Sequence, residues 1–504
     1  MVKFLGSNDA EKAGDYNLSH IDLINHRGDI IDLKYIVIEM NIYESIYKNA
    51  ITGSLVIADE GNQIGRMSIQ GLERIAFHLK TPGVAYGKED VVDASEETGE
   101  PYHIYKISDR KQLNRGIMSY TLHFASREFM RNIRTKVSQA YDGKYDRAVI
   151  NIMKDKNYLD SRKKIHVEPT GNSLKFVVPN LNPFDAINMI ANKSLPEKSK
   201  GAGYFFYETT GGFYFRSWQS MITNQGEFAR PYKQNFYSQP AKISDVAESR
   251  DEKTGAKQDK VLREYQTVEQ YSFVNNFHDV AANTTLGTYA HRVISHDLFN
   301  KSYDITDYNF HREYNKTPHT DTVGEWGNTK YPIMDTPVDY DNAKNLSDYK
   351  ESRVSLQTTT PFLHDKDVGK YGLEPLQDGL KTGQKISQQN QVVHGTALKL
   401  VIKGQSQVQA GQLITFNLGD VNSANTDNPN DPRFSGNYII TKVRHQVVKD
   451  QYRMILECAK DSVATEYGEL GDGYNGADAG FAMNIHTANK SSLELEEIDG
   501  DIYT

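Results

Sequence analysis

The 504-residue sequence has few cysteines and tryptophans and no long apolar run. Its single cysteine, Cys458, excludes an internal disulfide framework and a zinc site made of several cysteines. The first residues lack the apolar stretch of a secretory signal, and no run of 18 apolar residues occurs that could cross a bilayer. We therefore expect a protein that is assembled in the cytoplasm and has no membrane anchor.

The chain also lacks an excess of basic residues. It has 58 Lys and Arg against 66 Asp and Glu, a net charge of −8. Residues 466–504 contain nine acidic residues and one basic residue, which accounts for the whole of this charge. Residues 1–465 are balanced, which argues against a general nucleic-acid-binding protein. We predict that 466–504 is an acidic flexible tail whose partner the sequence does not identify.

Motifs of the common enzyme classes are missing. The sequence contains neither a Walker phosphate-binding loop nor a Gly-x-Ser-x-Gly nucleophile elbow. Adjacent acids such as Glu96 and Glu97 are typical of solvated surface, not of carboxylates opposed across a cleft. Gly471–Gly476 matches the bare Gly-x-Gly-x-x-Gly pattern, but no strand pattern precedes it. We predict no catalytic residue, no cofactor-binding residue and no cofactor.

Two segments contain residues that could bind a metal. The first combines histidines and aspartates, at His291, His296, Asp297, Asp304, Asp307, His311 and His319. Their spacing differs from the compact helical His pair of metalloproteases, and half-polar strands commonly expose histidines. The second, Asp420–Asp431, departs from a calcium loop at Ala424 and Asn425, where an oxygen ligand and a glycine are needed. We predict no metal site in either segment.

Residues 15–127 have the pattern of a small β-domain. Apolar and polar residues alternate along Leu72–Leu79 and Ile117–Ala125, and Asn25–Asp29 and Pro82–Gly83 are turn clusters. About six short strands with few helical signals predict an antiparallel barrel or sandwich.

Residues 128–260 combine helices with strands. Helical spacing occurs in Asp146–Tyr158, and Pro183 stands at the first position of another predicted helix. The aromatic segment Gly203–Trp218 predicts a hairpin with Thr-Gly-Gly at its turn. We expect a peripheral α+β domain followed by an exposed linker loop at 247–260.

Strand patterns return in residues 261–314 and 394–465. The segment between them, 315–393, is polar and rich in Asp, Asn, Thr and Pro. We predict that 261–314 and 394–465 form a second β-domain and that 315–393 is a polar insertion ending in a helix over 376–391. The predicted fold class is mainly β with α+β insertions.

An internal similarity links the two β-domains. Tyr102–Ile107 followed by Tyr120–Ser126 is similar to Tyr438–Val443 followed by Tyr452–Cys458, with Tyr, Ile, Lys and alternating apolar residues in register. The similarity favours a duplicated β-domain, while coincidence between two short hairpins is the alternative.

Three segments carry a resemblance to a known family: Ile51–Asp59, Gly287–Asp297, and Ala410–Ile414 with Phe434–His445. They resemble the central baseplate hub protein of contractile-tailed, T-even-like bacteriophages. The closing segment, with Gly-x-Tyr-x-Ile and a basic strand ending in His445, is also similar to the hub part of type VI secretion spikes and R-type bacteriocins. The resemblance covers about residues 15–465.

This resemblance implies a non-enzymatic structural protein of the virion tail. In the family the hub is a homotrimer in which each chain contributes two β-barrel tube domains, here about 15–127 and 261–314 plus 394–465. The resulting ring of six barrels adapts the sixfold tail tube to the threefold central spike. The unit at 128–227 would then face the spike.

The same resemblance implies the partners. They are two further copies of the chain, the central spike protein, the tail tube protein and neighbouring baseplate proteins. Tape protein and DNA pass through the lumen without specific binding, for which a balanced or slightly acidic wall is suitable. The strand parity that faces this lumen is left open by the sequence.

Two alternative functions remain at this stage. One is a virion-associated cell-wall hydrolase, whose site would be an Asp or Glu pair. The other is a receptor- or carbohydrate-binding tail protein, suggested by the aromatic residues Tyr204, Phe213, Tyr214 and Trp218. At strand spacing such residues are more typical of a core or an interface.

Overall fold

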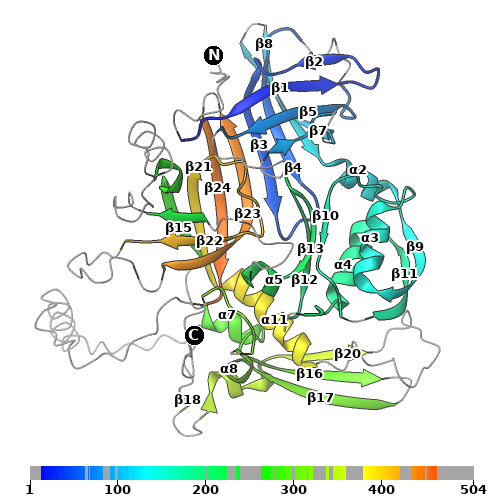
Figure 1. Cartoon of the computed structure of the whole chain (residues 1–504), viewed down its shortest axis with the longest axis vertical. Helices are drawn as coiled ribbons and strands as arrows, with labels where there is room; N and C mark the ends of the chain where they lie inside the picture. The colour runs from blue at the N-terminus through cyan, green and yellow to red at the C-terminus, as the bar shows by residue number, and fades with distance from the viewer. Residues whose placement is uncertain are drawn as a thin grey trace, which may run out of the picture. The chain divides into compact units, whose positions relative to one another are not determined.

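The fold is mainly antiparallel β-sheet with helical insertions, which confirms the predicted fold class (Figure 1). The computed structural model describes residues 13–62, 66, 69–82, 91–96, 100–114, 116–171, 173–198, 201–223, 234–238, 263–275, 279–297, 301–314, 316–321, 337–339, 344–358, 379–419, 431, 434–448 and 451–462. The predicted acidic tail, the linker loop at 247–260, the Gly471–Gly476 segment and most of the Asp420–Asp431 loop lie outside these residues. Within the described residues, no helix has the length and apolar character needed to cross a bilayer.

One sheet of 14 strands dominates the described part of the chain. Eight of its strands lie side by side in the order β15 (Gln270–Asn275), β21 (Thr396–Lys403), β24 (Gln451–Lys460), β23 (Gly436–Val448), β3 (Val37–Ser45), β4 (Thr52–Asp59), β8 (Ile117–Ala125) and β7 (Tyr102–Asn114). The path continues to β5 (Arg74–Lys80), β1 (Asn17–Ile24) and β2 (Ile30–Asp32), while β6 (Val92–Asp93) pairs with β5. On the other side, β22 (Leu413–Asn417) joins β23 to β14 (Gln234–Tyr237).

The strands of this sheet follow the period of two that their sequences show. In β24, Tyr452, Met454 and Leu456 are buried, while Gln451 and Arg453 are exposed. The buried residues of both halves of the sheet belong to one hydrophobic core, because β23 and β3 join the halves directly. We call the side away from this core the open face of the sheet.

The α+β part of the chain has its own core. It comprises α2 (Arg127–Arg134), β9 (Val137–Lys144), α3 (Tyr145–Lys154), β10 (Ile165–Val167), β11 (Ser173–Leu181), α4 (Pro183–Lys193), β12 (Tyr204–Thr209), β13 (Gly212–Ser217) and α5 (Trp218–Thr223). Pro183 occupies the start of α4, where its missing N–H costs nothing, as predicted. The predicted aromatic hairpin is present as β12 and β13, paired from Tyr204 with Ser217 to Thr209 with Gly212.

A third group of elements follows β15. It contains α7 (Val280–Thr285), β16 (Ala290–Asp297), β17 (Ser302–Asn309), α8 (Phe310–Tyr314), β18 (Pro337–Asp339), β19 (Lys344–Asn345), the 3-10 turns η4 (Leu346–Asp348) and η5 (Lys350–Ser352), β20 (Val354–Thr358) and α11 (Gly379–His394). The predicted helix over 376–391 corresponds to α11. This helix packs on β16 and β17, and a Cβ on Gly383 would stand 2.7 Å from the Tyr308 ring.

The pairing of this group corrects two predicted assignments. Among the described strands of segment 261–314, β15 alone joins the large sheet, because β16 and β17 form a separate sheet with β20 from the predicted insertion. The insertion at 315–393 therefore supplies a strand and a helix to its neighbours. In addition, β14, placed by the sequence in the 128–260 segment, pairs with β22. Strand patterns indicate that a segment is extended, but they do not identify its partner.

Gly53 of β4 provides a test of the packing beneath the sheet. A Cβ at this position would stand 2.2 Å from the Phe124 ring and 2.5 Å from the Asn41 carbonyl oxygen. Gly53→Ala should destabilise the protein by about 1–3 kcal/mol, the usual cost of overpacking. Urea unfolding should show no such loss for Val56→Ala, since Val56 lies half-buried on the open face. Equal stability of Gly53→Ala and the wild type would contradict this packing.

Candidate assembly interface

The eight central strands consist of two four-stranded repeats in the same order. Repeat A is β3, β4, β8 and β7, and repeat B is β15, β21, β24 and β23. In both repeats every neighbouring pair is antiparallel. The sheet is thus one motif used twice, and the last strand of repeat B adjoins the first strand of repeat A.

The hairpins at the end of each repeat share their register. In repeat A, Ile104 lies opposite Phe124 and Lys106 opposite His123. In repeat B the corresponding pairs are Ile440 with Cys458 and Lys442 with Glu457.

A β-bulge interrupts both hairpins at the same point, between Ile104 and Lys106 and between Ile440 and Lys442. A bulge inserts an extra residue into one strand of a pair. Two bulges at equivalent positions therefore indicate that the two hairpins have the same backbone structure. This geometry supports duplication over chance similarity.

The register also corrects the alignment of the second strands. The sequence similarity matched Tyr120 with Tyr452, whereas the hairpin register places Tyr120 at the position of Met454. The shift is two residues, so the side chains keep the same parity. The turn of the second hairpin is correspondingly shorter.

The remaining strands extend this correspondence. Leu55 in β4 lies opposite Leu122, as Leu400 in β21 lies opposite Leu456. Next to them, Met40 of β3 pairs with Leu55 and Tyr271 of β15 pairs with Leu400. Four strands in each repeat therefore occupy equivalent positions.

An internal seam joins the repeats, where β23 pairs antiparallel with β3 from Lys442 opposite Ser45 to Val448 opposite Glu39. Arg444 donates from Nε to Asn41 Oδ1 at 2.9 Å and forms an ion pair with Glu39 at 3.1 Å. Backbone pairing and charged side chains thus hold together strands from opposite ends of the chain.

The two outer edges of the tandem repeats are open over most of their length. In the described residues, β5 pairs with β7 only at Tyr102 and His103, and the outer edge of β15 has no strand beside it. Large apolar side chains are exposed on these strands, with Leu113 on β7 56% exposed and Val274 on β15 50% exposed. Open edges with exposed apolar residues are typical sites of pairing with another chain.

Glu44 connects three parts of the chain from the buried face of β3. Its Oε1 accepts from the Thr210 amide at 2.8 Å, and its Oε2 accepts from the Ala410 amide at 2.9 Å. His445 Nε2 lies 3.6 Å from Oε1, and the side chains of Glu44 and His445 are fully buried. One carboxylate therefore holds the β12–β13 turn and the turn before β22 against repeat A.

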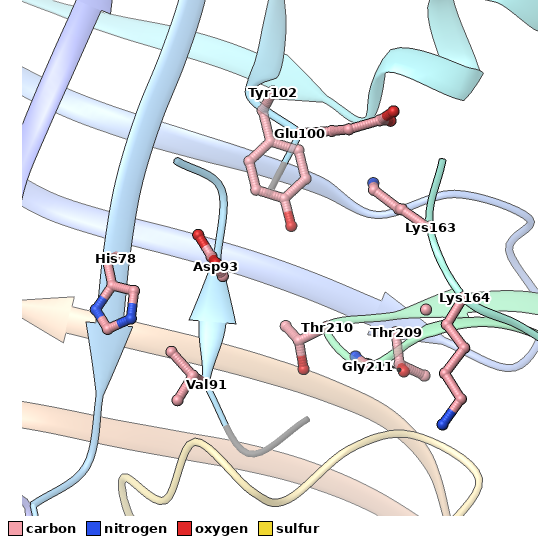
Figure 2. Close-up of a pocket in the computed structure, with 11 residues that line it drawn as sticks. His78, Val91, Asp93, Glu100, Tyr102, Lys163, Lys164, Thr209, Thr210 and Gly211 are labelled. Atoms are coloured by element: carbon pink, nitrogen blue, oxygen red, sulfur yellow. Dashed lines mark hydrogen bonds between the residues drawn. The ribbon is translucent and has the colours of Figure 1, made fainter. Parts of the chain in front are cut away.

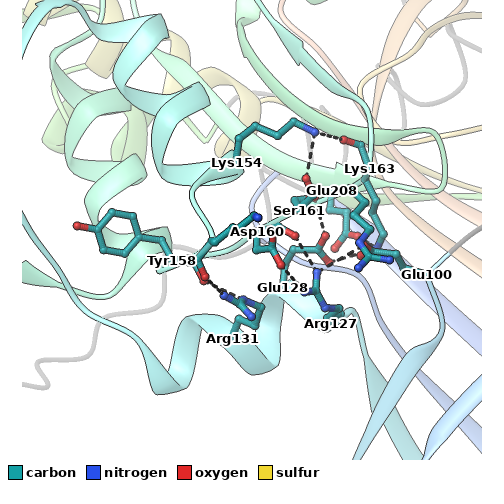
Figure 3. A network of polar contacts seen from close by, with 12 residues as sticks. Glu100, Arg127, Glu128, Arg131, Lys154, Tyr158, Asp160, Ser161, Lys163 and Glu208 are labelled. Atoms are coloured by element: carbon teal, nitrogen blue, oxygen red, sulfur yellow. Dashed lines mark hydrogen bonds and ion pairs between the residues drawn. The ribbon is translucent and has the colours of Figure 1, made fainter.

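A second buried network lies where the α+β part meets the first β-domain (Figure 3). Lys163 Nζ pairs with Glu208 Oε1 at 2.5 Å and with Glu128 Oε2 at 3.5 Å. Glu208 also accepts from the Ile51 amide at 2.8 Å, and Arg127 pairs with Glu100 at 3.4 Å. The buried lysine is thus balanced by several carboxylates.

The pKa values in this network diverge. Burial raises the pKa of Glu100 to about 7, and the Glu128 carboxylate adds to this shift. Burial would also raise the pKa of Glu128, but the Lys163 ammonium and the Ser161 hydroxyl hold it below its usual range. Although burial favours neutral Lys163, the Glu128 and Glu208 carboxylates raise its pKa. Burial also raises the pKa of Glu208, against the opposing effect of Lys163, and Glu100 takes up a proton near neutrality.

A cavity of about 400 Å³ lies beside this network, between β5, β6 and the β12–β13 turn (Figure 2). Its lining includes His78, Asp93, Tyr102 and Lys163. The charged groups make structural contacts, since Asp93 accepts from the amide and hydroxyl of Ser95 and Lys163 pairs with Glu208. Asp93 and Lys163 are thus engaged in structural contacts at the edge of this cavity.

The candidate metal residues do not gather. His291 is buried, with Nδ1 3.2 Å from the Gly287 carbonyl, and Asp307 pairs with Arg292 at 2.7 Å. His319 instead contacts Asp461 at 2.9 Å. Across the described part of the chain, no three His, Cys, Asp or Glu side chains form a metal-binding group.

The aromatic residues that suggested carbohydrate binding are inside the protein. Tyr204, Phe213, Tyr214 and Trp218 are all buried, and Trp218 is 1% exposed. They pack between the α+β part and the large sheet, as core residues at strand spacing are expected to do, so these four residues do not form an exposed aromatic platform.

Sequence reasoning missed both Glu44 and Lys163. For Glu44 a signal was present, because it continues the apolar parity of Met40 and Ile42 and so places a charge in the core. For Lys163 the neighbouring sequence gives no such pattern, since its acidic partners come from distant segments.

Comparison with known proteins gives structural similarities only. No protein-family model matches the chain, and no curated protein matches its sequence. The chain is similar to a tail protein from Neisseria meningitidis MC58, at 10% identity and TM-score 0.44, covering 89% of this chain and 97% of that one. The prophage MuSo2 43 kDa tail protein from Shewanella oneidensis has 7% identity and TM-score 0.44, with 88% and 98% covered. The E. coli c3393 protein, a type VI secretion component, has 9% identity and TM-score 0.38, with 86% and 76% covered.

Glu44 offers a test of the buried junction. Glu44→Gln removes one acceptor oxygen and should leave a buried amide unsatisfied, destabilising the protein by about 1–3 kcal/mol. The control is Glu457→Gln, which removes a partly exposed ion pair with Lys442 and should cost no more than about 1 kcal/mol. Urea unfolding measures both, and equal effects would argue against the junction.

The raised pKa of Glu100 predicts that the stability of the protein depends on pH. Because its pKa is raised from 4.5 to about 7, its contribution to stability is full below about pH 4.5 and is lost as the pH rises through 7. Glu100→Gln, which resembles the protonated acid, should have wild-type stability at low pH and greater stability than wild type above pH 7. Unfolding midpoints across this range test it, with the exposed Glu96→Gln as control. A constant difference between Glu100→Gln and wild type would refute the shift.

Proposed function

We propose that the chain is the structural hub of a phage tail baseplate, assembled as a trimeric ring between the sixfold tail tube and the threefold central spike. The observation that carries this proposal is the pair of four-stranded repeats joined in register through β23 and β3. A symmetry adaptor of this kind needs the same tube module twice in each chain.

The pairing at the internal seam indicates how neighbouring chains would pair. Within one chain, the last strand of repeat B pairs with the first strand of repeat A. The equivalent contact between chains pairs β7, the last strand of repeat A, with β15, the first strand of repeat B in the next copy. Such a head-to-tail interface closes into a ring when the rotation permits, and three chains then present six equivalent modules.

Closing the sheet into a ring turns one of its two faces toward a central channel. Eight strands from each of three chains make 24, and at about 4.8 Å per strand they enclose a channel roughly 37 Å across between backbones. The remaining domains cover the core side of the sheet and cannot fit within such a channel. In this proposal the open face therefore lines the lumen, which is the strand parity that the sequence left open.

The other parts take the roles implied by the resemblance. Residues 15–127 form the first tube domain, and 261–314 with 394–465 contribute the second, with β16 and β17 in a separate sheet. The α+β unit faces the spike, and neighbouring baseplate proteins and the tail tube are further partners. The role is non-enzymatic, and the protein resides in the virion after assembly in the host cytoplasm.

Disulfide cross-linking tests the seam between chains. Gln446 lies opposite Asn41 in the internal seam, and the equivalent residues are Lys111 on β7 and Ser272 on β15. Lys111→Cys combined with Ser272→Cys should give a covalent trimer on a non-reducing gel, because directly opposed strand residues are within disulfide reach. The native Cys458 is buried and should not interfere.

Two further variants control this experiment. Asn41→Cys with Gln446→Cys should cross-link within one chain and leave a monomer on the gel. Lys111→Cys with Gln270→Cys is displaced by two residues and should cross-link poorly. A monomer at micromolar concentration with no cross-linked product from the in-register pair would contradict the ring.

A further inference from the structure

The two repeats share a backbone template but differ in charge on the open face. On this face, four basic side chains of repeat B, Lys399, Lys403, Arg444 and Arg453, have no basic counterpart in repeat A, whereas Lys442 corresponds to Lys106. The repeat A positions equivalent to the first four hold uncharged residues, respectively Ser54, Ala58, Ser108 and Ser119. Packing does not require this difference, since the same strand positions accept serine and alanine in repeat A.

The basic residues of repeat B form one group. Together with Lys442, they occupy three neighbouring strands, β21, β24 and β23, and we call these five residues the basic strip. Lys442 is 50% exposed and Arg453 is 45% exposed. The strip extends about 10 Å across the strands and about 14 Å along them.

Three carboxylates partly neutralise the basic strip. Glu457 pairs with Lys442 at 2.6 Å, and Glu39 pairs with Arg444 at 3.1 Å. Glu269 pairs with both Lys403 and Arg453. Five cations against three carboxylates leave a positive surface in which most charges are already paired. The expected balanced or slightly acidic wall therefore does not describe this repeat.

The chemistry of the strip favours a polyanion as its partner. Its larger apolar neighbours on the open face, Val401, Val448 and Ile455, are half-buried. A protein partner would be expected to meet exposed apolar or aromatic residues at the centre of the contact. Binding to a phosphate backbone needs only cations, and its strength depends on how many counterions they release.

We propose that the basic strip makes weak, sequence-independent contact with the phosphate backbone of double-stranded DNA, and that Glu39, Glu269 and Glu457 keep this contact weak. Each carboxylate competes with phosphate for its cation, so DNA is attracted to the wall without being held. The inference rests on the proposed function only for placing the strip inside a ring. In that ring, three basic strips alternate with three repeat A surfaces that lack four of the five strip cations.

Two substituted proteins test the strip with a fluorescent random-sequence DNA duplex. In the first, Glu39→Gln, Glu269→Gln and Glu457→Gln free the cations, and affinity at low salt should rise about tenfold or more. The slope of log affinity against log salt should steepen by about 0.9 for each additional phosphate that the freed cations neutralise. In the second, Lys399→Ser, Lys403→Ala, Arg444→Ser and Arg453→Ser introduce the repeat A residues and should abolish the wild-type binding.

Asp142→Asn is the matched control, because it frees Lys175 on an exposed strand of the α+β part without touching the strip. An equal rise in DNA affinity from this substitution, or no rise from the three glutamine substitutions, would overturn the proposal. Stronger competition by polyglutamate than by DNA would overturn the choice of partner.

Sedimentation of the same samples separates this proposal from the proposed function. Trimeric variants with unchanged DNA affinity would refute the strip and leave the hub intact. A monomeric wild type would refute the hub, whereas a strip-dependent change in DNA affinity on that monomer would still support the strip.

Discussion

The structure depends on the pairing of β23 with β3. This ladder joins a strand near the end of the described chain to one near its start and merges two β-domains into a single sheet with one core. Without it, β3 would expose a full edge of unpaired amides and carbonyls, and β23 would expose the part of its edge from Lys442 to Val448. The orientation of one repeat relative to the other, and any contact that copies this orientation, follows from the register of this pair.

Buried charges reinforce the places where separate segments meet. Glu44 binds amides from the β12–β13 turn and from the segment before β22, while Glu208 binds the Ile51 amide and Lys163. Apolar packing would tolerate small shifts between these segments, but a carboxylate with two directed hydrogen bonds accepts few arrangements. The polar contacts therefore contribute mainly to the precision of the junction.

Local sequence patterns predicted the elements more reliably than their partners. Pro183 marked the start of α4, the aromatic segment gave β12 and β13, and the helix before 394 is present as α11. Alternation along Ala290–Asp297 indicated a strand, but the choice of β20 as its neighbour depends on chain geometry that no local pattern encodes.

The candidate interface shows the same limit. The matching tyrosines and isoleucines of the two hairpins were visible in the sequence, yet an alignment by residue type misplaced one strand by two positions. The bulges after Ile104 and Ile440 can be located only from the strand pairing. Once the repeats are aligned by this pairing, Lys399 and Ser54 are seen to occupy equivalent positions. The amino-acid composition shows only that residues 1–465 are balanced in charge, so it could not reveal the charge difference between the two repeats.

The pairing of β3 with β23 also has a consequence for synthesis on the ribosome. About 390 residues separate these strands, so at about 5–20 residues per second β3 waits roughly 20–80 s for its partner to emerge. During this interval its edge is available to other nascent strands. Glu39 and Glu44 place two negative charges along that edge, and charged edge residues disfavour mispairing. The two glutamates that later stabilise the seam can thus protect β3 from mispairing until β23 has been synthesised.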